Sequence, residues 1–244
     1  MNDEIRCKIC DRLIFYNYRV GQDMWYHCAC GCVFNNKQID KKEVFNEEYK
    51  IEYDKLKGIK DRYSYYIRTY MNFIEEKTYG RKFLDVGFCL DYNILEMRER
   101  GWLATGIDLI KNPYITGDFE HYDFGKERFD LIFMADVLQC LDNPVKAIYK
   151  AYSLLQPRGM LFIVTPNTDL LYEEIVSSWE HWNIKENRQL LSEQNLLDIL
   201  ARVDKEMTGR FKVILKHNTE SKRFISWNNI HIIAQKEKIE EFKR

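Results

Sequence analysis

The sequence predicts an α/β fold in which a mostly parallel, seven-stranded sheet carries helices on both faces, with a small cysteine-rich module before it. Two observations lead to this fold class. From residue 79 onward, uniformly apolar runs alternate with amphipathic stretches, as in parallel sheets that are covered on both sides. Before that point, five of the seven cysteines lie between Cys7 and Cys32.

Composition narrows the class of protein. The 244 residues carry a net charge of −1, with 45% hydrophobic and 31% charged residues, as is usual for a globular domain. A neutral chain does not favour nucleic acid or a membrane surface as partner. The start Met1-Asn2-Asp3-Glu4 resembles no signal peptide, and no apolar run approaches the ~20 residues of a membrane helix. We therefore expect a cytoplasmic protein with reduced thiols.

Residues 1–38 are expected to form a zinc ribbon. Because reduced cysteines do not form a disulfide framework, a cluster of them indicates a metal site. Two ligand pairs with two-residue gaps suit tetrahedral zinc. The spacing gives the ligand set Cys7, Cys10, His27 and Cys30, with Cys28 as the alternate to His27 and Cys32 as a competitor.

Residues 39–78 are expected to form a helical lid or linker. Apolar and aromatic residues recur there at three- and four-residue steps from Tyr63 to Ile74, which indicates a helix packed by one face. Gly80 then marks its end.

Residues 79–244 are expected to form the main domain. Amphipathic stretches at 94–98, 145–154 and 193–203 predict helices. Apolar runs predict strands at 83–87, 103–109, 114–116, 129–134, 160–164, 211–215 and 230–234.

A ligand site is expected at the carboxyl ends of these strands, where open α/β sheets bind ligands. Asp85 and Gly87 end the first strand, and Asp108 ends the second. An acid at that distance from the glycine turn can accept hydrogen bonds from both hydroxyls of a ribose. The turn Gly87-Phe88-Cys89-Leu90-Asp91 lacks the further glycines of a dinucleotide site, and its acid would repel phosphates. A nucleoside ligand without phosphates is therefore expected.

Residues 79–236 resemble a class I S-adenosylmethionine-dependent methyltransferase of the branch that methylates small molecules, which has a Rossmann-like fold. Five segments match this family's motifs in order: 83–87, 105–109, 117–120, 129–144 and 154–167, and the segment 229–234 resembles its last strand. S-adenosylmethionine has a ribose and a sulfonium but no phosphate, so it tolerates an acidic site.

The resemblance implies roles for eight cofactor-binding residues. They are Asp85 and Gly87 at the methionine end, Asp108 on the ribose, Leu109 beside it, Asp118 and Phe119 at the adenine, and Met134 and Ala135 in the floor. Three departures are evident. Cys89 and Asp91 replace glycines, Gln139-Cys140 replaces Glu-His, and Arg158 replaces a glycine.

Some sugar and metabolite methyltransferases carry a similar cysteine-rich module, and Cys30-Gly31-Cys32-Val33-Phe34 resembles its ending. A closed four-ligand zinc there has a structural role. For proton removal from the acceptor, His181 in Trp179-Glu180-His181-Trp182 is the catalytic candidate, because relatives build acceptor contacts in that region. The other candidate bases are His121, Asp123 and Glu186.

The expected function is methyl transfer from S-adenosylmethionine to a small-molecule acceptor, for example a sugar or related metabolite. Two alternatives stay open. One is a nucleic-acid methyltransferase that uses the zinc ribbon as reader, and the other is a non-catalytic scaffold with a methyltransferase-like fold. The sequence indicates neither an oligomeric state nor a membrane partner.

Overall fold

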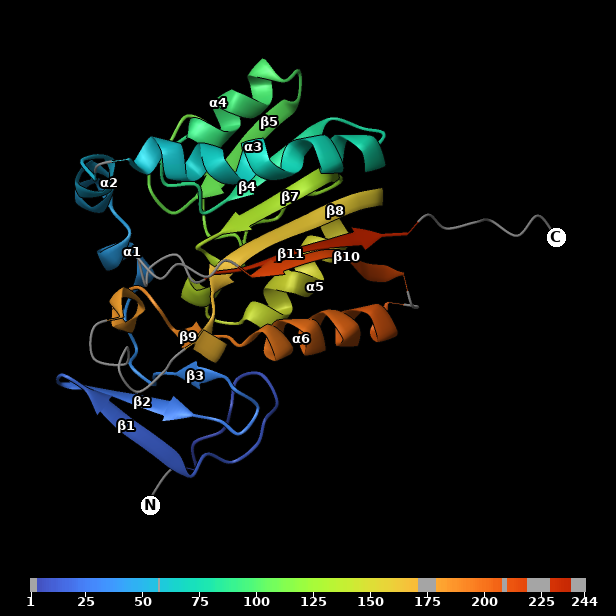
Figure 1. Cartoon of the computed structure of the whole chain (residues 1–244). Helices are drawn as coiled ribbons and strands as arrows, with labels where there is room; N and C mark the ends of the chain where they lie inside the picture. The colour runs from blue at the N-terminus through green and yellow to red at the C-terminus, as the bar shows by residue number, and fades with distance from the viewer. Residues whose placement is uncertain (1–3, 57, 171–178, 208–209, 219–228, 238–244) are drawn as a thin grey trace.

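The computed structural model describes residues 4–56, 58–170, 179–207, 210–218 and 229–237. A sheet lies at its centre (Figure 1). It has seven strands in the order β10-β11-β8-β7-β4-β5-β6. Strand β11 runs opposite to the other six strands, so the predicted mostly parallel sheet is confirmed. The strands are β4 (Lys82–Val86), β5 (Leu103–Asp108), β6 (Ile115–Thr116), β7 (Phe129–Ala135), β8 (Leu155–Pro166), β10 (Phe211–Asn218) and β11 (Asn229–Lys236).

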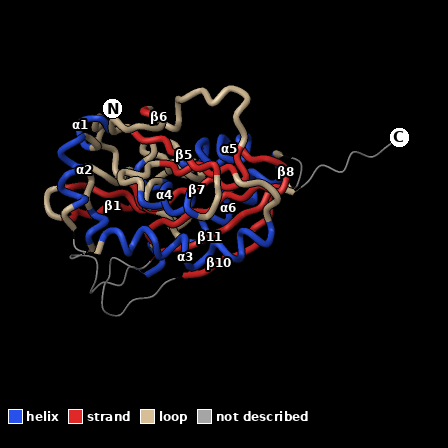
Figure 2. The backbone as a smooth tube through the Cα atoms, turned by 90° about the horizontal axis from the view of Figure 1, so that it is seen from above, coloured by secondary structure: helices blue, strands red, loops and turns tan. Residues whose placement is uncertain are grey.

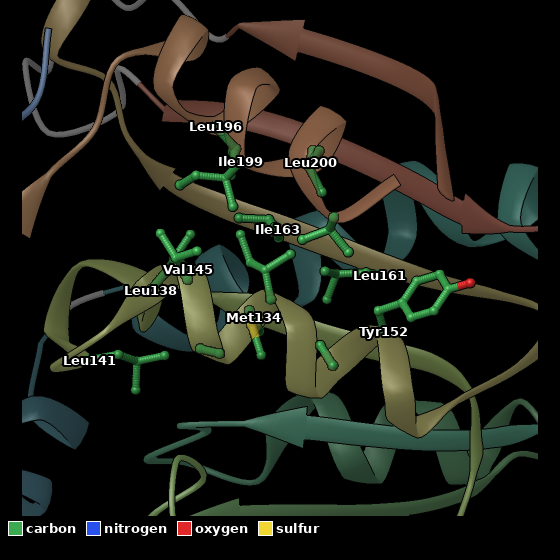
Figure 3. Packing of buried hydrophobic residues seen from close by; sticks show 14 of the residues in the cluster. Met134, Leu138, Leu141, Val145, Tyr152, Leu161, Ile163, Leu196, Ile199 and Leu200 are labelled. Atoms are coloured by element: carbon green, nitrogen blue, oxygen red, sulfur yellow. The ribbon is translucent and has the colours of Figure 1, made fainter. Parts of the chain in front are cut away.

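Strand alternation divides the interior into two apolar layers, one on each face of the sheet. Phe133 and Phe162 point toward α3 (Ile59–Lys77) and α4 (Tyr92–Glu99). Their neighbours Met134 and Ile163 point the other way, toward α5 (Pro144–Leu154) and α6 (Glu193–Glu206), where Leu196 and Ile199 meet them (Figure 3). Because both faces are covered, the strands are apolar along their length.

Local signals set where the helices begin. Asn143 caps α5 by accepting a hydrogen bond from the Lys146 amide, and Pro144 occupies the first turn, where no amide is needed. Ser192 and Asn195 form a reciprocal capping box at the start of α6.

Helix α3 lies against β11, far from it in sequence (Figure 2). The Tyr70 hydroxyl and His231 Nδ1 are 2.6 Å apart in this interface, and both side chains are buried. Among the described residues, every helix is too short or too polar to span a lipid bilayer.

The segment Pro157-Arg158-Gly159 turns the chain within β8. Leu155 pairs with Phe129, but the next pair joins Met160 to Leu131, so the intervening residues bulge out of the sheet.

A second, smaller sheet has the order β1-β2-β3-β9. Strands β1 (Tyr16–Val20), β2 (Asp23–His27) and β3 (Val33–Phe34) come from the N-terminal segment. Strand β9 (Gln189–Leu190) comes from far along the chain, just before α6. The sequence did not indicate this fourth strand.

Candidate functional site

Four cysteines of the N-terminal segment come together: Cys7, Cys10, Cys28 and Cys30, hereafter the cysteine cluster. All four Sγ atoms lie within 4.8 Å of one another. The Cys7–Cys30 and Cys10–Cys28 pairs are 3.7 and 3.5 Å apart. Four sulfurs at ~2.3 Å from one tetrahedral zinc ion lie ~3.8 Å from each other. The donor set and its size therefore fit zinc.

The spacing in the sequence favoured His27 as a ligand, but the cysteine cluster contains the alternate, Cys28, in its place. Strand alternation gives the reason. Tyr26 and Cys28 share one face and pack with Cys7, whereas His27 falls on the opposite face and is exposed.

Two tight turns hold the cysteines in place. The amides of Ile9 and Cys30 donate to the sulfurs of Cys7 and Cys28, at 3.4 and 3.5 Å. Gly31 has a φ of +92°, and a Cβ there would lie 2.7 Å from Ser192 Oγ. A glycine is therefore required where this turn meets α6.

A cavity of about 460 Å³ opens at the carboxyl ends of β4, β5 and β7. Its wall includes six of the eight residues assigned from the sequence: Gly87, Asp108, Leu109, Asp118, Phe119 and Ala135. The other two lie behind the wall. Asp85 is 2% exposed, and Met134 is fully buried because its strand position points it toward α5. The sequence suggested that Met134 lines the floor of the site, but its side chain does not reach the cavity.

Asp108 is the acid at the centre of the wall. Its two oxygens accept the amides of Cys89 and Ile110, each at 2.8 Å. Burial raises the pKa of Asp108, and these amides counteract part of that shift. Each oxygen keeps a second lone pair, so the carboxylate can also accept hydrogen bonds from a ligand in the cavity.

Gly87 forms the turn after β4 with a φ of +67°. A Cβ at this position would lie 2.4 Å from Val137 Cγ2. The glycine is thus required by the backbone conformation and by a packed valine, whereas the sequence suggested that a ligand would need the space.

Cys89 and Asp91, which replace family glycines, leave the cavity open. Cys89 belongs to the wall, while the Asp91 carboxylate accepts the Tyr114 hydroxyl at 3.2 Å and is not in the wall. Cys89 has a φ of +48°, in the left-handed region that favours glycine.

This strain gives a testable prediction. Cys89→Ala removes the thiol and keeps the left-handed backbone, whereas Cys89→Gly removes both the thiol and the strain. We expect the glycine variant to be more stable than the alanine variant by about 1 kcal/mol. Urea unfolding of the two proteins measures the difference. An alanine variant of equal or greater stability would contradict the prediction.

Asp85 hydrogen-bonds with Asn93, whose Nδ2 lies 3.2 Å from Asp85 Oδ2. Burial raises the pKa of Asp85 from 3.8 to about 8, because Asn93 compensates little of the lost hydration and Asp108 adds repulsion. Asp85 is therefore a neutral acid at pH 7 in the ligand-free protein.

The titration of Asp85 predicts a pH effect. Between pH 4 and 8 the folded state holds this proton and the unfolded state does not, so the free energy of unfolding falls as pH rises. Asp85→Asn removes this loss. Its stability relative to the original protein should rise from pH 5 to pH 8 by at least about 1.4 kcal/mol, the value of one pKa unit. Melting curves of both proteins measure it, and a difference independent of pH would refute it.

Lys41 of α1 (Lys41–Val44) anchors the helical segment to the cavity. Its Nζ lies 2.9 Å from Asp118 and Glu120 and 3.0 Å from Asp142. Burial alone would lower the pKa of Lys41, but the three carboxylates raise it. Partial burial would raise the pKa of Asp118, but the hydrogen bond and charge of Lys41 outweigh this effect, and the pKa of Asp118 is lowered. This ion cluster holds the start of α1 at the cavity rim.

An aromatic wall lines part of the cavity, formed by Phe45, Tyr49 and Tyr53. Phe45 and Tyr49 meet edge to face at 5.2 Å, and Tyr49 stacks on Tyr53 at 5.7 Å. Tyr49 and Tyr53 are four residues apart and lie on one side of α2 (Glu47–Asp54), and Phe45 comes just before this helix. Sequence reasoning assigned no site residue here, although this spacing was visible.

A polar wall also lines the cavity, formed by His181, Asn183, Glu186 and Asn187. His181 lies in the short helix η3 (Glu180–Trp182), and its carbonyl accepts Asn187 Nδ2 at 2.8 Å. Asn183 donates to Glu186 at 2.6 Å. Of the sequence-derived candidate bases, His181 and Glu186 are in the cavity, and His121 and Asp123 are not.

Comparison with known proteins places this site in a family. A family model described as a methyltransferase domain matches residues 59–208. The ubiquinone biosynthesis O-methyltransferase of Haemophilus ducreyi is 27% identical over 41% of this chain and 52% of its own. A probable polyketide synthase 9/36 of Dictyostelium discoideum is 27% identical over 40% of this chain and 4% of its own. The chain thus spans about half of the length of the first curated relative and a small part of the second.

A solved structure shares the fold over most of the chain. The 1,6-didemethyltoxoflavin-N1-methyltransferase of Burkholderia thailandensis, with bound 1,6-didemethyltoxoflavin and S-adenosylhomocysteine, has a TM-score of 0.59 at 14% identity, covering 91% of this chain and 100% of its own. Since the family model spans more than half of the sequence, the chain belongs to the class I S-adenosylmethionine-dependent methyltransferases.

Proposed function

We propose that this protein transfers a methyl group from S-adenosylmethionine to a small-molecule acceptor. The observation that carries the proposal is one cavity lined both by the turn and acid that follow β4 and β5 and by the polar wall. The aromatic wall lines the same cavity, whose volume of about 460 Å³ suits a cofactor with a small acceptor. The relatives named for ubiquinone biosynthesis and toxoflavin also act on small molecules.

In this proposal the sequence-derived residues hold the cofactor as follows. Asp108 accepts the ribose hydroxyls with its remaining lone pairs, and Leu109 packs beside the ribose. Asp118 and Phe119 contact the adenine, Gly87 shapes the methionine end, and Ala135 lies in the floor. Asp85 lies behind the cavity wall and acts on the methionine end through the turn after β4. When bound, S-adenosylmethionine supplies a methyl group that its sulfonium has already activated.

The protein's task is then mainly to align the acceptor, which supplies much of the rate in such displacements. An acceptor that must lose a proton needs a base within reach. We assign this role to His181, with Glu186 as the second candidate, because both belong to the polar wall.

We further propose that residues 1–38 form a structural zinc ribbon, that 39–78 form a lid, and that 79–244 bind the cofactor in a cytoplasmic enzyme. Four thiolates close the coordination shell of zinc and leave no open position for catalysis. The core of so short a segment is small, so metal binding would contribute to its folding.

Calorimetry with S-adenosylhomocysteine tests the cofactor site directly. Ligand at 100 times its dissociation constant stabilises a protein by about 2.7 kcal/mol, so the melting temperature should rise as well. NAD serves as the control ligand, since the turn after β4 carries Cys89 and Asp91 where a dinucleotide site has glycines. Absence of binding at millimolar S-adenosylhomocysteine would reject the proposal.

The acceptor class needs a second experiment. Methyl-labelled S-adenosylmethionine is incubated with the enzyme and a cell extract, which is then separated into metabolites and nucleic acid. We expect a labelled product other than S-adenosylmethionine in the metabolite fraction, and much less of this product with the Asp108→Ala variant. Label confined to nucleic acid would replace the small-molecule acceptor with the nucleic-acid alternative.

A further inference from the structure

The N-terminal sheet is completed by a strand from the catalytic part of the chain. Val33 pairs with Leu190, and Phe34 pairs with Gln189, so β9 forms the edge of the small sheet next to β3 (Figure 1). Residues 181–187, which supply the polar wall, come directly before β9. The polar wall is therefore attached to the N-terminal module through the backbone.

Aromatic packing ties the same two parts together. Trp25 of β2 is fully buried and meets Trp182 edge to face at 5.1 Å. Trp182 in turn contacts Trp179 at 5.2 Å. Val33 and Ile184 belong to this same buried cluster. Trp179 and Trp182, which lie close to His181 in the chain, thus pack with the module.

Hydrogen bonds from the module reach the polar wall. Asn35, which is 1% exposed, donates its Nδ2 to the Asn187 carbonyl at 2.5 Å. The backbone amide of Asn35 donates to the Arg188 carbonyl at 3.1 Å. Arg188 returns two bonds from its guanidinium, to the carbonyls of Lys37 and Ile39. Asn187 is therefore held from the module side and itself holds the His181 carbonyl.

The cysteine cluster meets the chain on the other side of β9. Asn195, in the first turn of α6, donates to the Cys30 carbonyl at 2.6 Å. Thr168 donates its hydroxyl to the Gly31 carbonyl at 3.1 Å. One turn of the cluster is thus seated directly on the start of α6.

We infer that the metal-holding module positions the polar wall and leaves the cofactor end of the cavity to the large sheet. Asn35 and Arg188 are the positioning residues. The inference rests on the proposed function in taking the polar wall as the acceptor site. The hydrogen bonds and ring contacts described above do not involve Gly87, Asp108 or Phe119, so we expect the module to act mainly on the polar wall.

Hydrogen exchange tests this without knowledge of the acceptor. The purified protein is compared before and after zinc removal by a chelator, and again after zinc is added back. Removal should speed exchange in 179–190 by about tenfold or more and shift the tryptophan emission to longer wavelength. Exchange in 83–90 and 105–119 and the S-adenosylhomocysteine affinity should stay within twofold.

Asn35→Ala tests the link with the metal ligands intact, and Lys37→Ala is the matched control, because the Lys37 side chain pairs with Asp23 inside the module. The Asn35→Ala variant should keep its zinc and its cofactor affinity but exchange faster in 179–190. The Lys37→Ala variant should keep its zinc, its cofactor affinity and its exchange rate in 179–190. Unchanged exchange in 179–190 in both experiments would overturn the inference. Equal acceleration in the cofactor strands would also overturn it, since the module would then stabilise the whole fold. Loss of S-adenosylhomocysteine binding in the untreated protein would reject the proposed function instead.

Discussion

Replacing Asp108 by alanine is expected to weaken S-adenosylhomocysteine binding by roughly 100-fold or more. Hydrogen bonds to a charged group contribute about 1.5–3 kcal/mol each, and the ribose offers two hydroxyls to this carboxylate. The variant also leaves the amides of Cys89 and Ile110 without their acceptor, so the glycine turn should loosen. Calorimetry measures the affinity, and unfolding of the ligand-free protein measures the structural part.

Asp91→Asn is the matched control for this prediction. Asp91 is an acid of the same turn, but its carboxylate bonds Tyr114 and is not in the cavity wall. Its replacement should change the affinity by less than about threefold. A dissociation constant for Asp108→Ala within threefold of the original would show that the ribose does not lie at this acid.

Replacing Lys41 by methionine should lower the free energy of unfolding by about 3 kcal/mol. Removal of one partner from a largely buried ion cluster leaves the other charges uncompensated, which typically costs 3–5 kcal/mol. The Lys41 and Glu120 side chains are only 11% and 8% exposed. Without the lysine, Asp118, Glu120 and Asp142 face one another. Urea unfolding at pH 7 measures the loss.

The pH dependence of this variant identifies the cause. Repelling carboxylates hold protons more tightly when folded than when unfolded, so the Lys41→Met protein should recover stability relative to the original as pH falls from 7 to 5. Lys41→Arg retains the charge and should lose less. Lys42→Met, at the exposed neighbouring position, should be neutral. A deficit that does not change with pH would point to lost packing in place of charge.

The large sheet could be predicted because its strands are buried on both faces and therefore appear as continuous apolar runs. The run at 129–134 became β7, and the run at 103–109 became β5. The ligand end followed from topology alone, since parallel strands bring their carboxyl ends to one edge. Asp108 and Gly87 therefore meet in one cavity, although twenty residues separate them.

Contacts between distant segments could not be predicted in the same way. The two residues of β9 have no strand signal of their own and are fixed by pairing with Val33 and Phe34. Lys41 looked like any surface lysine, because its three acids follow it by 77 residues or more. The choice of Cys28 over His27 needed the strand alternation of β2, which the spacing of ligands does not contain.

The shared small sheet also decides how the chain can be shortened. A protein beginning at residue 39 would lose β3 and leave the backbone of Gln189–Leu190 as a bare edge. It would also uncover Trp179, Trp182 and Ile184, which are buried when residues 1–38 are present. An unpaired edge beside an apolar patch attracts other copies of itself. Such a truncated enzyme would form aggregates instead of a smaller working catalyst.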